Sequence, residues 1–128
     1  MRFSLVLIIA GLTAACANQS QSTHPLDDQA YVAALEKQRE AVRAVRVYKE
    51  VPTDALGVRP VMAAACGSNA TMTAADEDYI LTGLKLKAYS LSSDSLAEVD
   101  IQQLPSEGTH CEGSVPIGGT AKAFTMRH

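Results

Sequence analysis

The spacing of apolar and polar residues changes several times along the chain, and each change predicts a different element. Alternation with a period of two, which is typical of a strand with one buried face, begins at Val45. In residues 45–51 the apolar positions are Val45, Val47 and Val51, and the polar positions are Arg46, Tyr48 and Glu50. Further extended runs cover residues 58–66, 96–104 and 118–126. The pattern therefore predicts four short strands.

Details of these runs indicate how the strands are used. Residues 96–104 alternate most cleanly, and the residues expected to face inward are Ala97, Val99 and Ile101. Pro60 lies near the start of its run and has no amide proton for a ladder, so we expect a sheet edge or a bulge there. Gly118 and Gly119 enter the last strand, where they predict a bulge or a close approach of the backbone.

Residues 26–41 have helical spacing instead. Pro25 suits the first turn of a helix, and Asp27 and Asp28 lie where the helix dipole is positive. The apolar stripe that follows consists of Tyr31, Leu35, Val42 and Val45, interrupted by Gln38. We therefore expect a helix over residues 26–41.

A second helix is predicted over residues 73–91. Thr73 and Asp76 form the pattern of a capping box, in which the Thr73 hydroxyl accepts from the amide of Asp76 and the Asp76 carboxylate accepts from the amide of Thr73. The apolar face of this helix consists of Ile80, Leu84, Ala88 and Leu91. Together the elements predict an α+β fold: a small, four-stranded, largely antiparallel sheet with the 73–91 helix packed across one face.

The N-terminal run has a different character. Arg2 is followed by ten apolar or small residues and then by Thr13, Ala14 and Ala15 directly before Cys16. This order is that of a secretory signal peptide, and the cysteine at its end resembles a bacterial lipobox, although Thr13 stands where leucine is usual. The alternatives are plain secretion and an uncleaved anchor. The apolar run is shorter than the roughly 20 residues needed to span a bilayer.

These features predict the organisation of the whole chain. Residues 1–15 are a lipoprotein signal peptide, residues 16–25 a lipidated flexible tether, residues 26–41 the N-terminal helix, and residues 42–128 a small disulfide-stapled α+β domain. Ala17 follows the lipidated Cys16 in place of Asp, the residue that, by resemblance to enterobacterial lipoproteins, retains a lipoprotein at the inner membrane. The expected location is the outer membrane, with acyl chains as the anchor and the domain facing the periplasm.

Cys66 and Cys111 are the cysteines that remain after Cys16. An even pair in an exported chain favours a disulfide, although two buried free thiols are the alternative. The sequence has no Trp and only six other aromatic residues, so its core must be built from small aliphatic side chains. In the chain-entropy model, a disulfide that closes a loop of this length stabilises a fold by about 4 kcal/mol. That is a large share of the total free energy of unfolding of a small domain.

The charge distribution limits the classes of partner. Eleven Lys and Arg against fourteen Asp and Glu give a net charge of −3, which disfavours nucleic acid as a partner. Basic residues concentrate between Lys37 and Lys49, and the residues that we expect to contact a partner are Arg39, Arg43 and Arg46. The partner surface would be acidic lipid headgroups or an acidic protein. An ordinary solvated face is the alternative.

Catalytic and metal-binding patterns are weak. The three histidines are far apart in the sequence: His24 lies in the tether, His110 in a loop and His128 at the last position. This placement does not favour a metal site. His110 beside Cys111 suggests a reactive thiol, but a cysteine with an expected partner is more often structural. We therefore predict no enzymatic activity and no cofactor.

Several short stretches recur in an order that resembles a known family. They are Val45-Arg46-Val47-Tyr48, Leu56-Gly57 before Cys66, and Cys111 followed by Gly118-Gly119-Thr120-Ala121. Residues 45–124 thereby resemble the RcsF family of outer-membrane lipoproteins, which sense envelope damage for the Rcs phosphorelay. The resemblance implies a small α/β domain with two disulfides, of which Cys66 and Cys111 match one. The positions of the other bridge fall on Gln102 and Ile117.

The tether departs from that family, whose long Pro- and Lys-rich segment is implied to thread through outer-membrane β-barrels. Here it is short, with Pro25 alone. The predicted function is an outer-membrane-anchored periplasmic lipoprotein that binds envelope proteins. The resemblance implies a stress sensor whose partners are an outer-membrane barrel or an Rcs-type inner-membrane component. The alternatives are a structural lipoprotein that supports an outer-membrane protein complex and a thiol-active enzyme.

Overall fold

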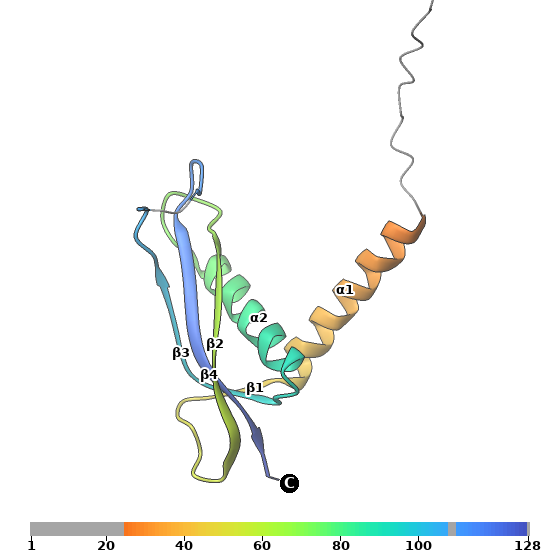
Figure 1. Ribbon diagram of the computed structural model, residues 1–128. Coiled ribbons are helices and arrows are strands. Elements are labelled where there is room, and N and C mark those ends of the chain that lie inside the picture. Colours follow the sequence, from red (N-terminus) through yellow and green to blue (C-terminus); the bar gives the residue numbers. More distant parts are fainter. Residues whose placement is uncertain (1–24, 108–109, 128) are drawn as a thin grey trace, which may run out of the picture.

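The computed structural model of the protein describes residues 25–107 and 110–127 (Figure 1). The predicted signal peptide, Cys16 and the residues that precede Pro25 lie outside this part of the chain. In chain order the elements are α1 (Pro25–Ala44), β1 (Arg46–Tyr48), β2 (Ala55–Cys66), α2 (Ala74–Ser90), β3 (Ser95–Gln103) and β4 (Pro116–Met126).

The four strands form one sheet in the order β1-β3-β4-β2. The β2–β4 and β3–β4 pairs are antiparallel, whereas β1 is parallel to β3 because the chain passes through β2 and α2 between them. Helix α2 packs across one face of the sheet, with contacts to β2, β3 and β4 (Figure 1). The predicted α+β class is confirmed, and the sheet is mixed.

Helix α2 begins as the sequence predicts. Thr73 is the N-cap, and both hydrogen bonds of the capping box are present. Ile80, Leu84 and Ala88 are buried, while Leu91, expected on the same face, is the exposed C-cap. The packed face of α2 is therefore one turn shorter than expected.

Two glycines allow α2 to approach the sheet closely. A Cβ at Gly119 of β4 would lie 2.6 Å from Cγ2 of Ile80, so only glycine leaves room for that side chain. On the helix itself, a Cβ at Gly83 would lie 3.2 Å from that of Ala63 in β2. The close approach predicted for Gly119 is thus confirmed.

The residues expected to face inward on β3 are buried or partly buried, but they do not all lie on the same face of the sheet. Leu96 pairs with Ala123 in the core beneath α2, whereas Ala97 pairs with Lys122 on the other face and is completely buried there. The register shifts between Ala97 and Asp100, where Glu98 has a φ of 52°. An extra residue in the strand resets the alternation. Beyond it the expected residues, Val99 and Ile101, do pack against the core.

The ends of several strands differ from the sequence pattern. β1 covers three residues, because Val45 already belongs to the core at the end of α1. β2 begins at Ala55 and shifts register between Leu56 and Arg59, beside Gly57 with its φ of 61°. Pro60 therefore lies next to a bulge on an edge strand, and that prediction is confirmed.

The second face of the sheet is not covered by a helix in the described part of the chain. Met62 is 71% exposed there, and its neighbours across β4 and β3 include exposed Thr120 and Asp100. Lys122 and Glu98 form an ion pair of 2.7 Å on this face. No helix in the described residues is long and apolar enough to span a bilayer.

Candidate functional site

Arg39 and Arg43, two of the three arginines expected to contact a partner, lie on the last turns of α1. They are exposed, and Nε of Arg43 donates to the carbonyl oxygen of Arg39 at 3.3 Å. A shallow hollow of about 700 Å³ is lined by Glu36, Arg39, Glu40, Val42 and Arg43. Two carboxylates therefore alternate with the two guanidinium groups, and this surface is balanced in charge.

Arg46 lies on a different surface. It is the first residue of β1 and lines a second hollow, of about 320 Å³. The lining residues of this hollow are Ala44, Arg46, Tyr48, Asp94, Ser95, Met126 and Arg127. Asp94 organises this hollow, because its Oδ1 accepts from the hydroxyl of Ser95 at 2.7 Å and from the amide of Met126 at 3.2 Å. The expected cluster of three arginines is thus divided between two hollows, and Arg46 has Arg127 as a neighbour that the sequence did not indicate.

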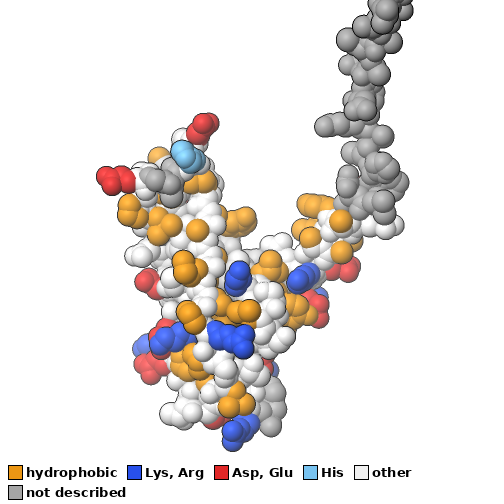
Figure 2. All heavy atoms as spheres, in the orientation of Figure 1, with side chains coloured by type: hydrophobic (Ala, Val, Ile, Leu, Met, Phe, Trp, Pro, Cys, Tyr) orange, Lys and Arg blue, Asp and Glu red, His pale blue; other side chains and the backbone are white. Residues whose placement is uncertain are grey.

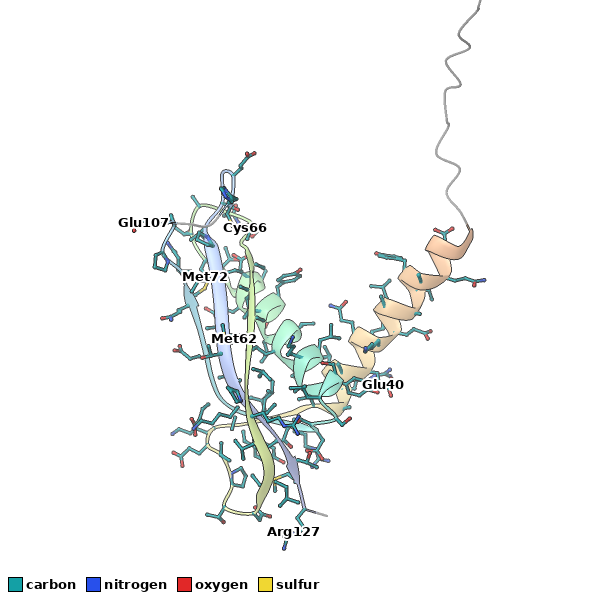
Figure 3. All side chains as sticks on the ribbon, viewed as in Figure 1. Glu40, Met62, Cys66, Met72, Glu107 and Arg127 are labelled. Atoms are coloured by element: carbon teal, nitrogen blue, oxygen red, sulfur yellow. A yellow bond between two sulfur atoms is a disulfide. The ribbon has the colours of Figure 1, made fainter. Side chains whose placement is uncertain are left out.

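The junction of α1 with α2 is held by a few specific contacts. Ala41 and Val45 are buried there. Nζ of Lys85 donates to the carbonyl oxygen of Val42 at 3.2 Å. The hydroxyl of Tyr89 donates to the carboxylate of Glu40, and this bond raises the pKa of Tyr89, with smaller contributions from burial and from the negative charge of Glu40. Figure 3 shows Glu40 at this junction.

Above the junction α1 and α2 diverge (Figure 1). A groove of about 270 Å³ lies between them, lined by Gln38, Ala63, Ala64, Tyr79, Ile80, Thr82, Gly83 and Leu86. The groove is mostly apolar and its floor is β2, an edge strand. Sequence reasoning missed it because its three elements are distant along the chain. The small residues Ala63 and Gly83 were the only signal for it.

The disulfide between Cys66 and Cys111 is present, with a Cα–Cα distance of 5.4 Å. It joins the end of β2 to the loop before β4 across 45 residues that include α2 and β3. Two backbone hydrogen bonds support the same end of the sheet, from Gly67 to Val115 at 2.7 Å and from Leu104 to Pro116 at 2.8 Å. A bridged sulfur is not a thiolate, so neither cysteine is a nucleophile in this state.

Asp76 is a buried carboxylate whose two oxygens are both used. Oδ1 accepts from the amide and hydroxyl of Ser68, at 2.9 and 3.0 Å. Oδ2 accepts from the amide and hydroxyl of Thr73, at 2.9 and 2.8 Å. The pKa of Asp76 is lowered, first by the amide of Ser68 and then by Thr73. Asp76 therefore joins the segment after β2 to the start of α2, and its role is structural.

A metal site requires a group of side chains that can hold the ion. No group of three His, Cys, Asp or Glu residues within residues 25–107 and 110–127 is placed to hold a metal ion. In the same part of the chain, every buried side-chain nitrogen or oxygen has a hydrogen-bond partner. The described surface includes hollows beside α1 and β1 and a groove between the helices.

Comparison with known proteins found no family model, no curated protein and no solved structure that matches this chain.

Proposed function

We propose that the protein is a lipid-anchored lipoprotein of the outer membrane whose domain faces the periplasm and binds other envelope proteins. The observation that carries the proposal is the N-terminal sequence, in which Arg2, an apolar run and small residues lead directly to Cys16. The disulfide between Cys66 and Cys111 agrees with an oxidising compartment. The exposed hollows and the groove supply binding surfaces.

The more specific form of the proposal is an envelope stress sensor of the RcsF type that feeds a phosphorelay. Its support is the resemblance of residues 45–124. The distance between anchor and domain restricts how such a sensor works. Eight residues separate Cys16 from Pro25, and the flexible tether that the sequence predicts there would span about 15–18 Å. The 20 residues of α1 add about 30 Å. The domain stays near the outer membrane, so a signal to the inner membrane requires compression or release.

The alternative is a structural lipoprotein that supports an outer-membrane protein complex. The charge balance of the α1 hollow fits this role as well as the sensor role, because two carboxylates beside Arg39 and Arg43 suit contact with a protein better than attraction to acidic lipid.

The anchor is tested by mass spectrometry of the mature amino terminus. We expect a chain that begins at Cys16 and carries acyl groups, and we expect Cys16→Ser to lose membrane attachment. An unmodified Cys16, or cleavage at another residue, would contradict the proposal.

The binding role is tested by crosslinking in intact cells. The triple variant Arg39→Ser/Arg43→Ser/Arg46→Ser should lose captured partners several-fold while it folds normally, since exposed substitutions rarely change stability by more than about 0.5 kcal/mol. The matched control replaces three other exposed cations, Lys49, Arg59 and Lys87, by Ser. Capture of a barrel or of a phosphorelay component favours the sensor, and capture of an assembly scaffold favours the structural role. Equal capture by both variants would make the arginines ordinary solvated surface.

A further inference from the structure

Most of α1 has no partner within the described chain. Only its last turn reaches the core, through Ala41 and then Val45, while residues 28–34 are all exposed. Figure 2 shows this helix standing away from the body with hydrophobic atoms on its surface. Tyr31 and Val32 are 66% and 53% exposed, and Val42 is 39% exposed. About ten residues of helix without tertiary contacts are marginal in water, so the outer part of α1 is suited to a partner.

Five residues of α1, of which Leu35 is partly buried and the others are exposed, form a regular seam. Asp28, Val32, Leu35, Arg39 and Val42 follow one another at intervals of four, three, four and three residues. This is the spacing of a helix that packs along another helix. The seam is apolar at three positions, acidic at its N-terminal end and basic toward its C-terminal end.

We propose that this seam binds the same seam of a second copy of the chain, with the two helices antiparallel across a two-fold axis near residue 37. Such an axis places Val32 opposite Val42 of the second copy and Leu35 opposite its Arg39. The aliphatic stem of Arg39 then covers Leu35. Each contact occurs twice, as a two-fold interface requires.

The charges of α1 select this arrangement. In an antiparallel pair, Glu36 lies beside Arg39 of the second copy, and Asp28 lies within one turn of its Arg43. A parallel pair would instead place Asp28 next to Asp28 of the second copy and Arg39 next to Arg39 of the second copy. Both contacts join like charges and are repulsive. Antiparallel helices also align their dipoles favourably.

A lipid surface fits the seam less well. The sequence of α1 holds four acids and three bases, which are Asp27, Asp28, Glu36, Glu40, Lys37, Arg39 and Arg43. Helices that lie on a membrane usually have a polar face rich in Lys and Arg. The balanced charges of α1 match a second helix of the same kind instead.

The proposal goes beyond the proposed function and does not require the lipid anchor. An interface made by two such helices lies near the lower limit for stable complexes, which is about 1,200 Å² of total buried surface. We therefore expect a reversible dimer with a dissociation constant on the order of 10 µM.

Disulfide trapping tests the contact in the full chain within the membrane. Val32→Cys/Val42→Cys should give a covalent dimer under mild oxidation, because each new thiol lies opposite the other in the second copy. The matched control is Ala33→Cys/Val42→Cys, whose first thiol is exposed on the same helix but outside the seam. We expect at least five times more dimer from the first variant. Equal yields would overturn the proposal.

Sedimentation equilibrium of the full chain in density-matched detergent tests the charges. The unchanged chain and Ala33→Glu should reach twice the monomer mass as concentration rises, and Val32→Glu should stay monomeric. Glu36→Arg should weaken the dimer at least tenfold, and Glu36→Arg/Arg39→Glu should restore it. A monomer for the unchanged chain at every concentration, or no difference between Val32→Glu and Ala33→Glu, would overturn the proposal. A third outcome is that no dimer forms and that Val32→Glu loses crosslinks to a different envelope protein. That outcome would contradict the dimer and assign the seam to that protein.

Failure of the dimer leaves the proposed function intact, because the anchor and the capture of envelope proteins are measured separately. Conversely, an unmodified Cys16 would contradict the lipid anchor but would leave the dimer proposal standing, because sedimentation measures association independently of the anchor.

Discussion

The two helices of this protein differ in what holds them. Helix α2 has a capping box at its start, a buried face of Ile80, Leu84 and Ala88, and glycines that let it lie close to the sheet. Helix α1 is longer, yet only its last turn is buried. Both follow from helical patterns in the sequence. The spacing of apolar residues is similar in α1 and α2, but their tertiary contacts differ greatly. Apolar spacing therefore predicts that a helix forms, and it does not predict what the helix packs against.

The largest expected effect is on the α2 side of this comparison. Cys66→Ser/Cys111→Ser should lower the free energy of unfolding by about 4 kcal/mol, since the bridge closes the segment that contains α2 and β3. Urea unfolding followed by circular dichroism measures it. Cys66→Ser alone should behave like the double variant. A reduced protein that keeps its thermal midpoint would contradict the structural role of the bridge.

A matched pair of leucines compares the helices directly. Leu84→Ala in α2 should cost about 3 kcal/mol, because Leu84 is completely buried. Leu35→Ala in α1 should cost less than about 1 kcal/mol in the monomer, because Leu35 is only partly buried. Unfolding by urea at low protein concentration gives both values. Equal costs would mean that α1 is packed as firmly as α2.

The smallest expected effect concerns pH and Asp76. Its pKa is lowered in the folded protein, so the stability that it contributes is present above the ordinary pKa of 3.8 and is lost as the pH falls through the lower, folded value. Asp76→Asn should be less stable at pH 6, and the difference should shrink toward pH 2. Thermal unfolding of both proteins across this range measures the difference. A constant difference would show that the carboxylate charge does not matter.

Much of the fold could be predicted because local signals and tertiary structure agree. The capping box at Thr73, the edge position of Pro60 and the bridge between Cys66 and Cys111 each depend on chemistry that is visible in the sequence. Ala97 is buried as expected but does not share a face with Val99 and Ile101, because the bulge at Glu98 shifts the register without changing the alternation of residue types.

The candidate site was less predictable because it depends on the placement of distant segments. Arg39, Arg43 and Arg46 are close in the sequence, but the chain turns from α1 into the sheet between Arg43 and Arg46, so they line two hollows. The parallel pairing of β1 with β3 brings Arg46 near the end of β4, where Arg127 lies. The groove likewise appears only when β2 lies beside both helices.

The position of β2 has a consequence for solubility. An edge strand with unpaired backbone groups is a template on which other chains add strands and aggregate. β2 is twelve residues long and ends in Met62-Ala63-Ala64-Ala65-Cys66, which is apolar and uncharged. Pro60 and the irregular register beside it interrupt the first half, whereas α1 makes few contacts with the second half, where Gln38 lines the same groove as Ala63 and Ala64. The second half is therefore the part of this edge at which another chain could most readily add a strand.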